Sequence, residues 1–132
     1  MATNIENALA RLRADFKARA EGVLDDLEES LRQTDFDDSA GLDAFARRLY
    51  GDVHSLKGSG GTAGFHFVSK VAHRLEDYLA ARDGQLTAAD VPDLHRFMDT
   101  IRDSLDGQRP VDESEAEQIL ASLPTPTASA PS

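Results

Sequence analysis

Apolar residues recur every three or four positions along most of this chain, which places them on one face of an α-helix. The first such run spans residues 4 to about 32 and ends at a polar break over residues 34–39. A second run covers residues 42–56, and the glycines that follow it should end its helix near Gly64. The alternation of apolar and polar residues that is typical of β-strands is absent from the sequence.

Three shorter runs predict the remaining elements. A third helix is expected over residues 65–82, with Gly84 just past its end, where a left-handed cap is favoured. Asp90 is placed to cap a fourth helix, since Pro92 is tolerated in a first helical turn. A short helix over residues 115–123 follows. The predicted fold class is all-α, an antiparallel up-down four-helix bundle with a short fifth helix.

The length of 132 residues fits one domain, which we assign to residues 1–123. Residues 124–132 consist only of Pro, Thr, Ala and Ser and have no apolar periodicity. This composition predicts a disordered linker. One chain supplies enough apolar residues for the whole core, and we therefore expect a monomeric domain. The linker is typical of a tether to a further domain.

The composition of the chain argues against several kinds of site and partner. The chain has no cysteine, which excludes disulfides, thiolate zinc sites and cysteine nucleophiles. A formal net charge of -10 argues against nucleic acid as a partner. No window approaches the roughly 18 apolar residues that a membrane span needs, and the N-terminus lacks the features of a signal peptide. We therefore expect a cytoplasmic protein without membrane insertion.

The candidate chemistry lies on the second predicted helix. His54, Lys57, Gly58 and Gly61 share one helical face, which carries a cation and little bulk. A neutral imidazole can attack phosphorus through Nε2 if a carboxylate accepts the proton on Nδ1, and Glu76 is the candidate for that carboxylate. The ammonium of Lys57 could offset charge on a transferring phosphoryl group. The glycines would leave the ring open to a partner protein.

A family resemblance is carried by a continuous run of residues around this histidine: His54-Ser55-Leu56-Lys57-Gly58-Ser59-Gly60. The run resembles the signature of histidine phosphotransfer domains. Its continuation through Glu76 is most similar to the N-terminal phosphotransfer domain of the chemotaxis kinase CheA. The resemblance implies that His54 is phosphorylated and that Lys57, His73 and Glu76 form a hydrogen-bond network around it.

The resemblance also implies partners. A histidine kinase ATP-binding domain would phosphorylate the domain, and a CheY-like or CheB-like receiver domain would accept the phosphoryl group on an aspartate. ATP and Mg²⁺ would belong to these partners, so the domain itself is expected to bind no cofactor. The chain would then be the phosphoacceptor module of a histidine kinase, without an ATP-binding domain of its own. The docking surface is predicted to include the following residues: Ser55, Gly58, Ser59, Gly61 and Phe65.

Alternatives stay open beside this interpretation. The chain could be a free-standing phosphorelay protein or a non-catalytic helical adaptor. His54, His73 and Glu76 could also bind a metal ion, although we expect no metal site. The glycines formally fit a dinucleotide fingerprint, which is rejected because they follow a helix instead of a strand. Gly51 and Asp52 stand where the family often has an arginine beside an aromatic residue, which leaves the choice of kinase and regulator open.

Overall fold

The computed structural model describes residues 3–83, 85–106, 110 and 112–125, and these residues form helices without any strand. The elements are α1 (Asn4–Gln33), α2 (Ser39–Thr62), α3 (His66–Ala81), the 3₁₀ helix η1 (Ala88–Asp90), α4 (Val91–Leu105) and α5 (Glu113–Ser122). The predicted all-α class is thereby confirmed. The predicted cap at Gly84 and residues 126–132 of the predicted linker lie outside the described residues.

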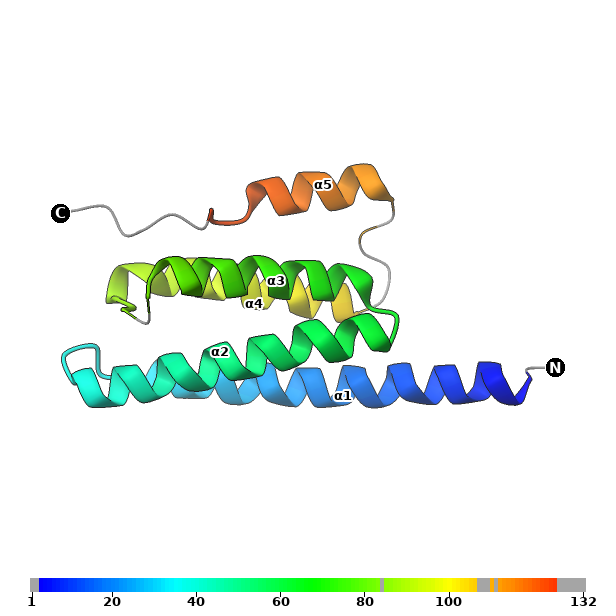
Figure 1. The fold of residues 1–132 in the computed structure, drawn as a ribbon, viewed down its shortest axis with the longest axis horizontal. Helices are drawn as coiled ribbons and strands as arrows, with labels where there is room; N and C mark the ends of the chain where they lie inside the picture. The colour runs from blue at the N-terminus through cyan, green and yellow to red at the C-terminus, as the bar shows by residue number, and fades with distance from the viewer. Residues whose placement is uncertain (1–2, 84, 107–109, 111, 126–132) are drawn as a thin grey trace.

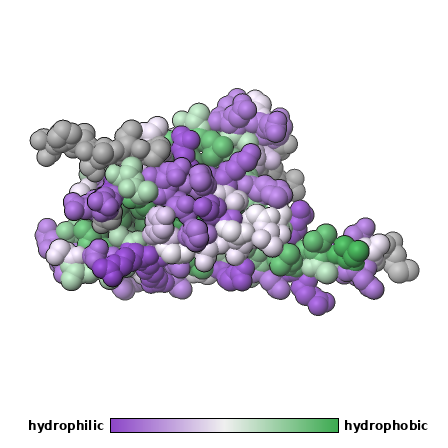
Figure 2. Space-filling view, viewed as in Figure 1, coloured by the Kyte–Doolittle hydropathy of each residue, from purple (hydrophilic) through white to green (hydrophobic). Residues whose placement is uncertain are grey.

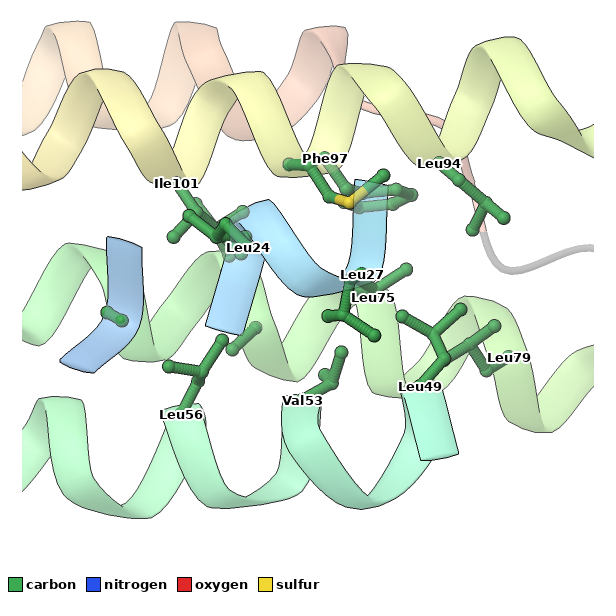
Figure 3. Packing of buried hydrophobic residues seen from close by; sticks show 14 of the residues in the cluster. Leu24, Leu27, Leu49, Val53, Leu56, Leu75, Leu79, Leu94, Phe97 and Ile101 are labelled. Carbon is green, nitrogen blue, oxygen red and sulfur yellow. The ribbon is translucent and has the colours of Figure 1, made fainter. Parts of the chain in front are cut away.

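Four helices enclose one core. The second helix packs along α1 and α3, and α4 packs along α3 and α1, so that their contacts form a closed ring (Figure 1). Leucine, valine, isoleucine and phenylalanine side chains from all four helices point toward a common centre (Figure 3). α5 lies outside this ring and contributes the buried Ala116. Within the described residues, no helix combines the length and apolar character that crossing a membrane requires.

The first helix continues beyond the bundle. Thr3 and Glu6 form a reciprocal capping box at its start, with hydrogen bonds of 3.0 and 3.2 Å. Residues 3–15, which we call the overhang, are all exposed, and Phe16 is the first buried residue. Figure 1 shows α1 extending past the end of α2 on the side of the N-terminus. The predicted amphipathic helix therefore forms, but the apolar face of its first turns is left uncovered by the described residues.

The turn between α2 and α3 places the second helix against the third. Gly64 has a φ of +88°, in the left-handed region that favours glycine. The amide of Phe65 donates to the carbonyl of Gly60 at 2.8 Å, the hydrogen bond that closes a Schellman-type helix end. Gly60 lies so close to its neighbours that a Cβ there would approach Cζ of Phe16 at 3.3 Å. This turn brings α3 back along α2.

The connection from α3 to α4 corrects one prediction. Asp90 stands at the N-cap position of α4, but its side chain makes no capping hydrogen bond there, and the 3₁₀ turn before it gives its backbone helical angles. Its carboxylate instead accepts from the amide of Thr87 at 3.0 Å and from Nε of Arg82 at 3.2 Å. The hydroxyl of Tyr78 lies 3.0 Å from Asp90 and 2.9 Å from Asp93, and burial is the largest cause that raises the pKa of this phenol. These contacts fix the start of α4 on α3.

Candidate functional site

The imidazole of His54 projects from α2 and is 66% exposed at its side chain. Its Nδ1 lies 2.8 Å from Oε2 of Glu76, which comes from the neighbouring helix α3. The α2–α3 turn makes this contact possible, since it aligns the two helices across 22 residues of sequence. The sequence prediction that Glu76 faces Nδ1 thus agrees with the position of the two side chains.

The second carboxylate oxygen of Glu76 completes the arrangement. Oε1 accepts a hydrogen bond from Nζ of Lys57 at 2.8 Å, and the Glu76 side chain is only 12% exposed. The hydrogen bond from Lys57, followed by that from His54, lowers the pKa of Glu76 and outweighs the effect of burial. An ionised carboxylate can only accept hydrogen bonds, so the ring proton of a neutral His54 resides on Nδ1. Nε2 is then left with a free lone pair.

Lys57 has a more specific position than the sequence indicated. Its ammonium binds Glu76, and its side chain is 26% exposed. Its backbone carbonyl accepts a hydrogen bond from Oγ of Ser69 at 2.7 Å, which ties this turn of α2 to α3. Lys57 therefore holds the carboxylate that orients His54. Its predicted contact with phosphoryl oxygens stays a prediction.

His73 has a different contact from these three residues. Its Nε2 is 3.4 Å from Oδ2 of Asp77, one turn further along the same helix. The predicted hydrogen bonding of His73 with the network around His54 stays a prediction. Because His73 pairs with Asp77, the histidines and Glu76 do not converge as metal ligands. Across the residues that the structure describes, no three His, Cys, Asp or Glu side chains are grouped so that they could hold a metal ion.

A hollow of about 460 Å³ opens beside His54. Three of the predicted docking residues line it, Ser55, Gly58 and Ser59. A Cβ on Gly58 would meet nothing within 4 Å, which agrees with the prediction of an open surface beside the ring.

The other two predicted docking residues lie elsewhere. A Cβ on Gly61 would face Oγ of Ser69 at 3.6 Å, on the side of α3. The ring of Phe65 packs against Phe16, with 5.3 Å between their centroids, and is partly buried on the core. Neither residue lines the hollow beside His54, so a contact of Gly61 or Phe65 with a partner stays a prediction.

The hollow also contains residues of α1 that sequence analysis did not single out. Leu12 and Arg19 line it together with His54, and the guanidinium of Arg19 lies 6.0 Å from the centroid of the Phe16 ring. These residues precede His54 by more than 30 positions. The helical pattern of α1 gives no indication of which of its faces would border the histidine, so no signal in the sequence identifies them.

Comparison with known proteins relates the chain to one family. Residues 11–108 match the family model described as the Hpt domain, which covers more than half of the chain and includes His54, Lys57 and Glu76. A search of curated proteins gave no match, and a search of solved structures gave none either.

Proposed function

Since the chain belongs to the Hpt domain family, whose members carry out histidine phosphotransfer in phosphorelay signalling, we propose that His54 is its phosphorylated residue. The observation that carries this proposal is the contact of Nδ1 with Glu76 at 2.8 Å on an imidazole that is otherwise exposed. The contact directs the lone pair of Nε2 outward, where a phosphoryl donor can reach it. Hpt domains interact with kinases and with response regulators, and both steps of the proposed function use such partners.

In the first step, Nε2 of His54 attacks the γ-phosphorus of ATP bound to a kinase domain. The bond between phosphorus and nitrogen forms as the bond to the leaving oxygen of ADP breaks. The ring becomes cationic as Nε2 bonds to phosphorus, and the ionised Glu76 stabilises the proton that remains on Nδ1. Lys57 keeps that carboxylate in position.

In the second step, a carboxylate oxygen of a receiver aspartate attacks the phosphorus. The bond between phosphorus and Nε2 breaks, and its electron pair returns to the ring, so His54 regains its neutral form. We infer that ATP and Mg²⁺ belong to the partner domains and that this domain binds no cofactor. The motif resemblance supports a CheA-like, chemotaxis-type system in the cytoplasm, with a CheY-like or CheB-like receiver as the acceptor.

We further propose the up-down antiparallel arrangement for α1 to α4, which the alternating directions of successive helices in Figure 1 support. In this arrangement the face of α2 with His54 is bordered by α1 on one side and by α3 on the other. The partner is then expected to approach through the hollow that Leu12, Ser55 and Gly58 line. A docking protein would leave again after transfer, so the contact should be transient.

The test uses labelled ATP and the catalytic domain of a CheA-type kinase. Acid-labile, base-stable label should appear on the wild type and be absent from His54→Gln. His66→Gln is the matched control, since it removes a histidine of the neighbouring helix α3 that has no part in the proposed site, and it should retain the label. Label on His54→Gln would mean that another residue is the acceptor. Absence of label from every variant with several kinases would favour the adaptor alternative.

A further inference from the structure

A groove of about 420 Å³ runs beside α3 and is bordered by Leu120 of α5. Its lining includes four basic side chains, Lys57, Lys70, His73 and Arg74, and a single acidic residue, Asp77. We call this the basic groove. The net charge of its lining is opposite in sign to that of the whole chain, which has 24 acidic residues against 14 lysines and arginines. Such a concentration of basic groups on an acidic protein marks a place where negative charge can bind.

The groove follows from the helical spacing of α3. Lys70, His73, Arg74 and Asp77 occupy positions i, i+3, i+4 and i+7 of the helix and so share one face. Asp77 contacts His73 at 3.4 Å and Glu76 pairs with Lys57 at 2.8 Å, so Lys70 and Arg74 carry most of the positive charge of the groove. Nε of Arg74 is buried and has no hydrogen-bond acceptor within the described part of the chain. A buried donor without an acceptor is unfavourable, which leaves the guanidinium of Arg74 with hydrogen-bonding capacity that no described residue uses at Nε.

The groove adjoins the proposed phosphorylation site through Lys57. This residue lines the groove and binds Glu76, which in turn binds His54. The hollow that contains His54 and Leu12 lies on the side of α1. A protein that covers His54 would therefore meet apolar residues of α1 in the hollow and, beyond Lys57, basic residues of α3 in the groove.

We propose that the basic groove is the electrostatic docking surface for the acidic face of the domain that accepts the phosphoryl group from His54. This inference rests on the proposed function. The acceptor atom is a carboxylate oxygen, and a divalent cation that offsets charge in phosphoryl transfer is itself held by carboxylates. The reacting face of the acceptor is accordingly acidic, and the overall charge of -10 would repel it. Lys70 and Arg74 attract and orient that face without contacting the phosphorus.

The experiment separates docking from chemistry. The protein is phosphorylated with phosphoramidate, a small donor that needs no docking, and transfer to a CheY-like receiver domain with Mg²⁺ is followed over a range of receiver concentrations. Lys70→Glu should lower kcat/KM for transfer about tenfold at low salt and leave the rate at saturating receiver unchanged. The difference should shrink in high salt, because screening weakens the attraction. Arg74→Gln should act in the same direction.

Two controls make the outcome decisive. Arg32→Glu introduces the same change of charge in the last turn of α1, which is not part of the groove. This variant should transfer the phosphoryl group like the wild type. Circular dichroism spectra and thermal unfolding establish that Lys70→Glu is folded. Equal kcat/KM for Lys70→Glu and the wild type would overturn the proposal. Slower phosphorylation by the kinase with unchanged transfer to the receiver would also overturn it, since the groove would then serve the donor.

Further outcomes distinguish this proposal from its premise. Failure of phosphoramidate to label His54 in the wild type would contradict the proposed function itself. Labelling of His54 with charge-independent transfer would contradict only the role of the groove. Calorimetric binding of inorganic phosphate that is lost in Lys70→Glu, together with unchanged transfer, would identify a small-anion site instead of a protein docking surface.

Discussion

Among single residues, Glu76 has the largest effect on the site, because its carboxylate determines which nitrogen of the His54 imidazole carries the proton. Its two oxygens have separate partners, His54 and Lys57, each at 2.8 Å. The lysine keeps the carboxylate ionised, the carboxylate keeps the proton on Nδ1, and Nε2 is consequently free. A substitution at any one of the three residues therefore changes the hydrogen bonding or the charge environment of the other two.

Glu76→Gln tests this dependence directly. The amide has no charge to stabilise the cationic ring that forms during phosphorylation, and we expect phosphorylation of His54 by a kinase to slow roughly 10- to 100-fold. The measurement is the initial rate of labelling from ATP. Asp77→Asn is the matched control, since this acid is the next residue on α3 and contacts His73. Equal rates for Glu76→Gln and the wild type would remove Glu76 from the proposed mechanism.

The same carboxylate predicts a pH dependence of stability. The pKa of Glu76 in the folded protein is below its ordinary value of 4.5. The unfolded chain thus binds a proton more readily, and the contribution of the ionised carboxylate is complete above pH 4.5 and is lost as the pH falls below that value. We expect the free energies of unfolding of the wild type and Glu76→Gln to converge on acidification. A difference that grows below pH 4.5 in urea titrations would contradict this sign.

The contact of His54 with Glu76 follows from features that are visible in the sequence, whereas the contact of His73 with Asp77 does not. The first pair depends on two long helices joined at glycines, and both features are visible in the spacing of residues. The second depends on a competition between Glu76 and Asp77 for the same imidazole. Asp77 is one turn away on the same helix, which makes the local contact easy to form.

At the scale of helices, the α2–α3 turn is the feature on which the site depends. Gly64 supplies the left-handed conformation and Gly60 the close approach of α2 to Phe16 and Val68. Helix boundaries here follow the periodicity of the sequence within a few residues. The start of α4 after Asp90 follows it too, but the sequence gives no sign that a 3₁₀ turn precedes this helix and engages the Asp90 carboxylate.

Gly58 and Gly60 offer a matched comparison within one helix. Alanine is favoured over glycine in a helix by about 1 kcal/mol, so Gly58→Ala should raise the free energy of unfolding by up to that amount. At Gly60 the new Cβ would lie 3.3 Å from Cζ of Phe16 and 3.6 Å from Cγ1 of Val68, and the cost of displacing them offsets the gain. Gly60→Ala should therefore be the less stable of the two variants. Equal stabilities in urea unfolding would show that the core yields without cost.

At the scale of the whole molecule, the described residues leave one end of α1 uncovered. Ile5, Leu9 and Leu12 are 73%, 53% and 40% exposed, and Figure 2 shows apolar surface on this protruding end. The sequence predicts the amphipathic helix but not this exposure, because the pattern of α1 is independent of where α2 ends. Leu12 also lines the hollow with His54, so a protein that occupies the hollow is well placed to cover the overhang.

Leu9→Gln tests whether the overhang takes part in docking. The side chain is already half in water, so the free energy of unfolding should change by less than about 0.5 kcal/mol. If the receiver covers the overhang, KM for transfer from phosphorylated His54 should rise several-fold, whereas Ala10→Gln, an exposed neighbour, should leave it unchanged.

Three side chains per copy are few for a stable dimer, which usually buries more than about 1,000 Å², so the wild type should sediment as a monomer. A dimer that dissociates in Leu9→Gln, with KM unchanged, would instead mean that a second copy of the chain covers the overhang.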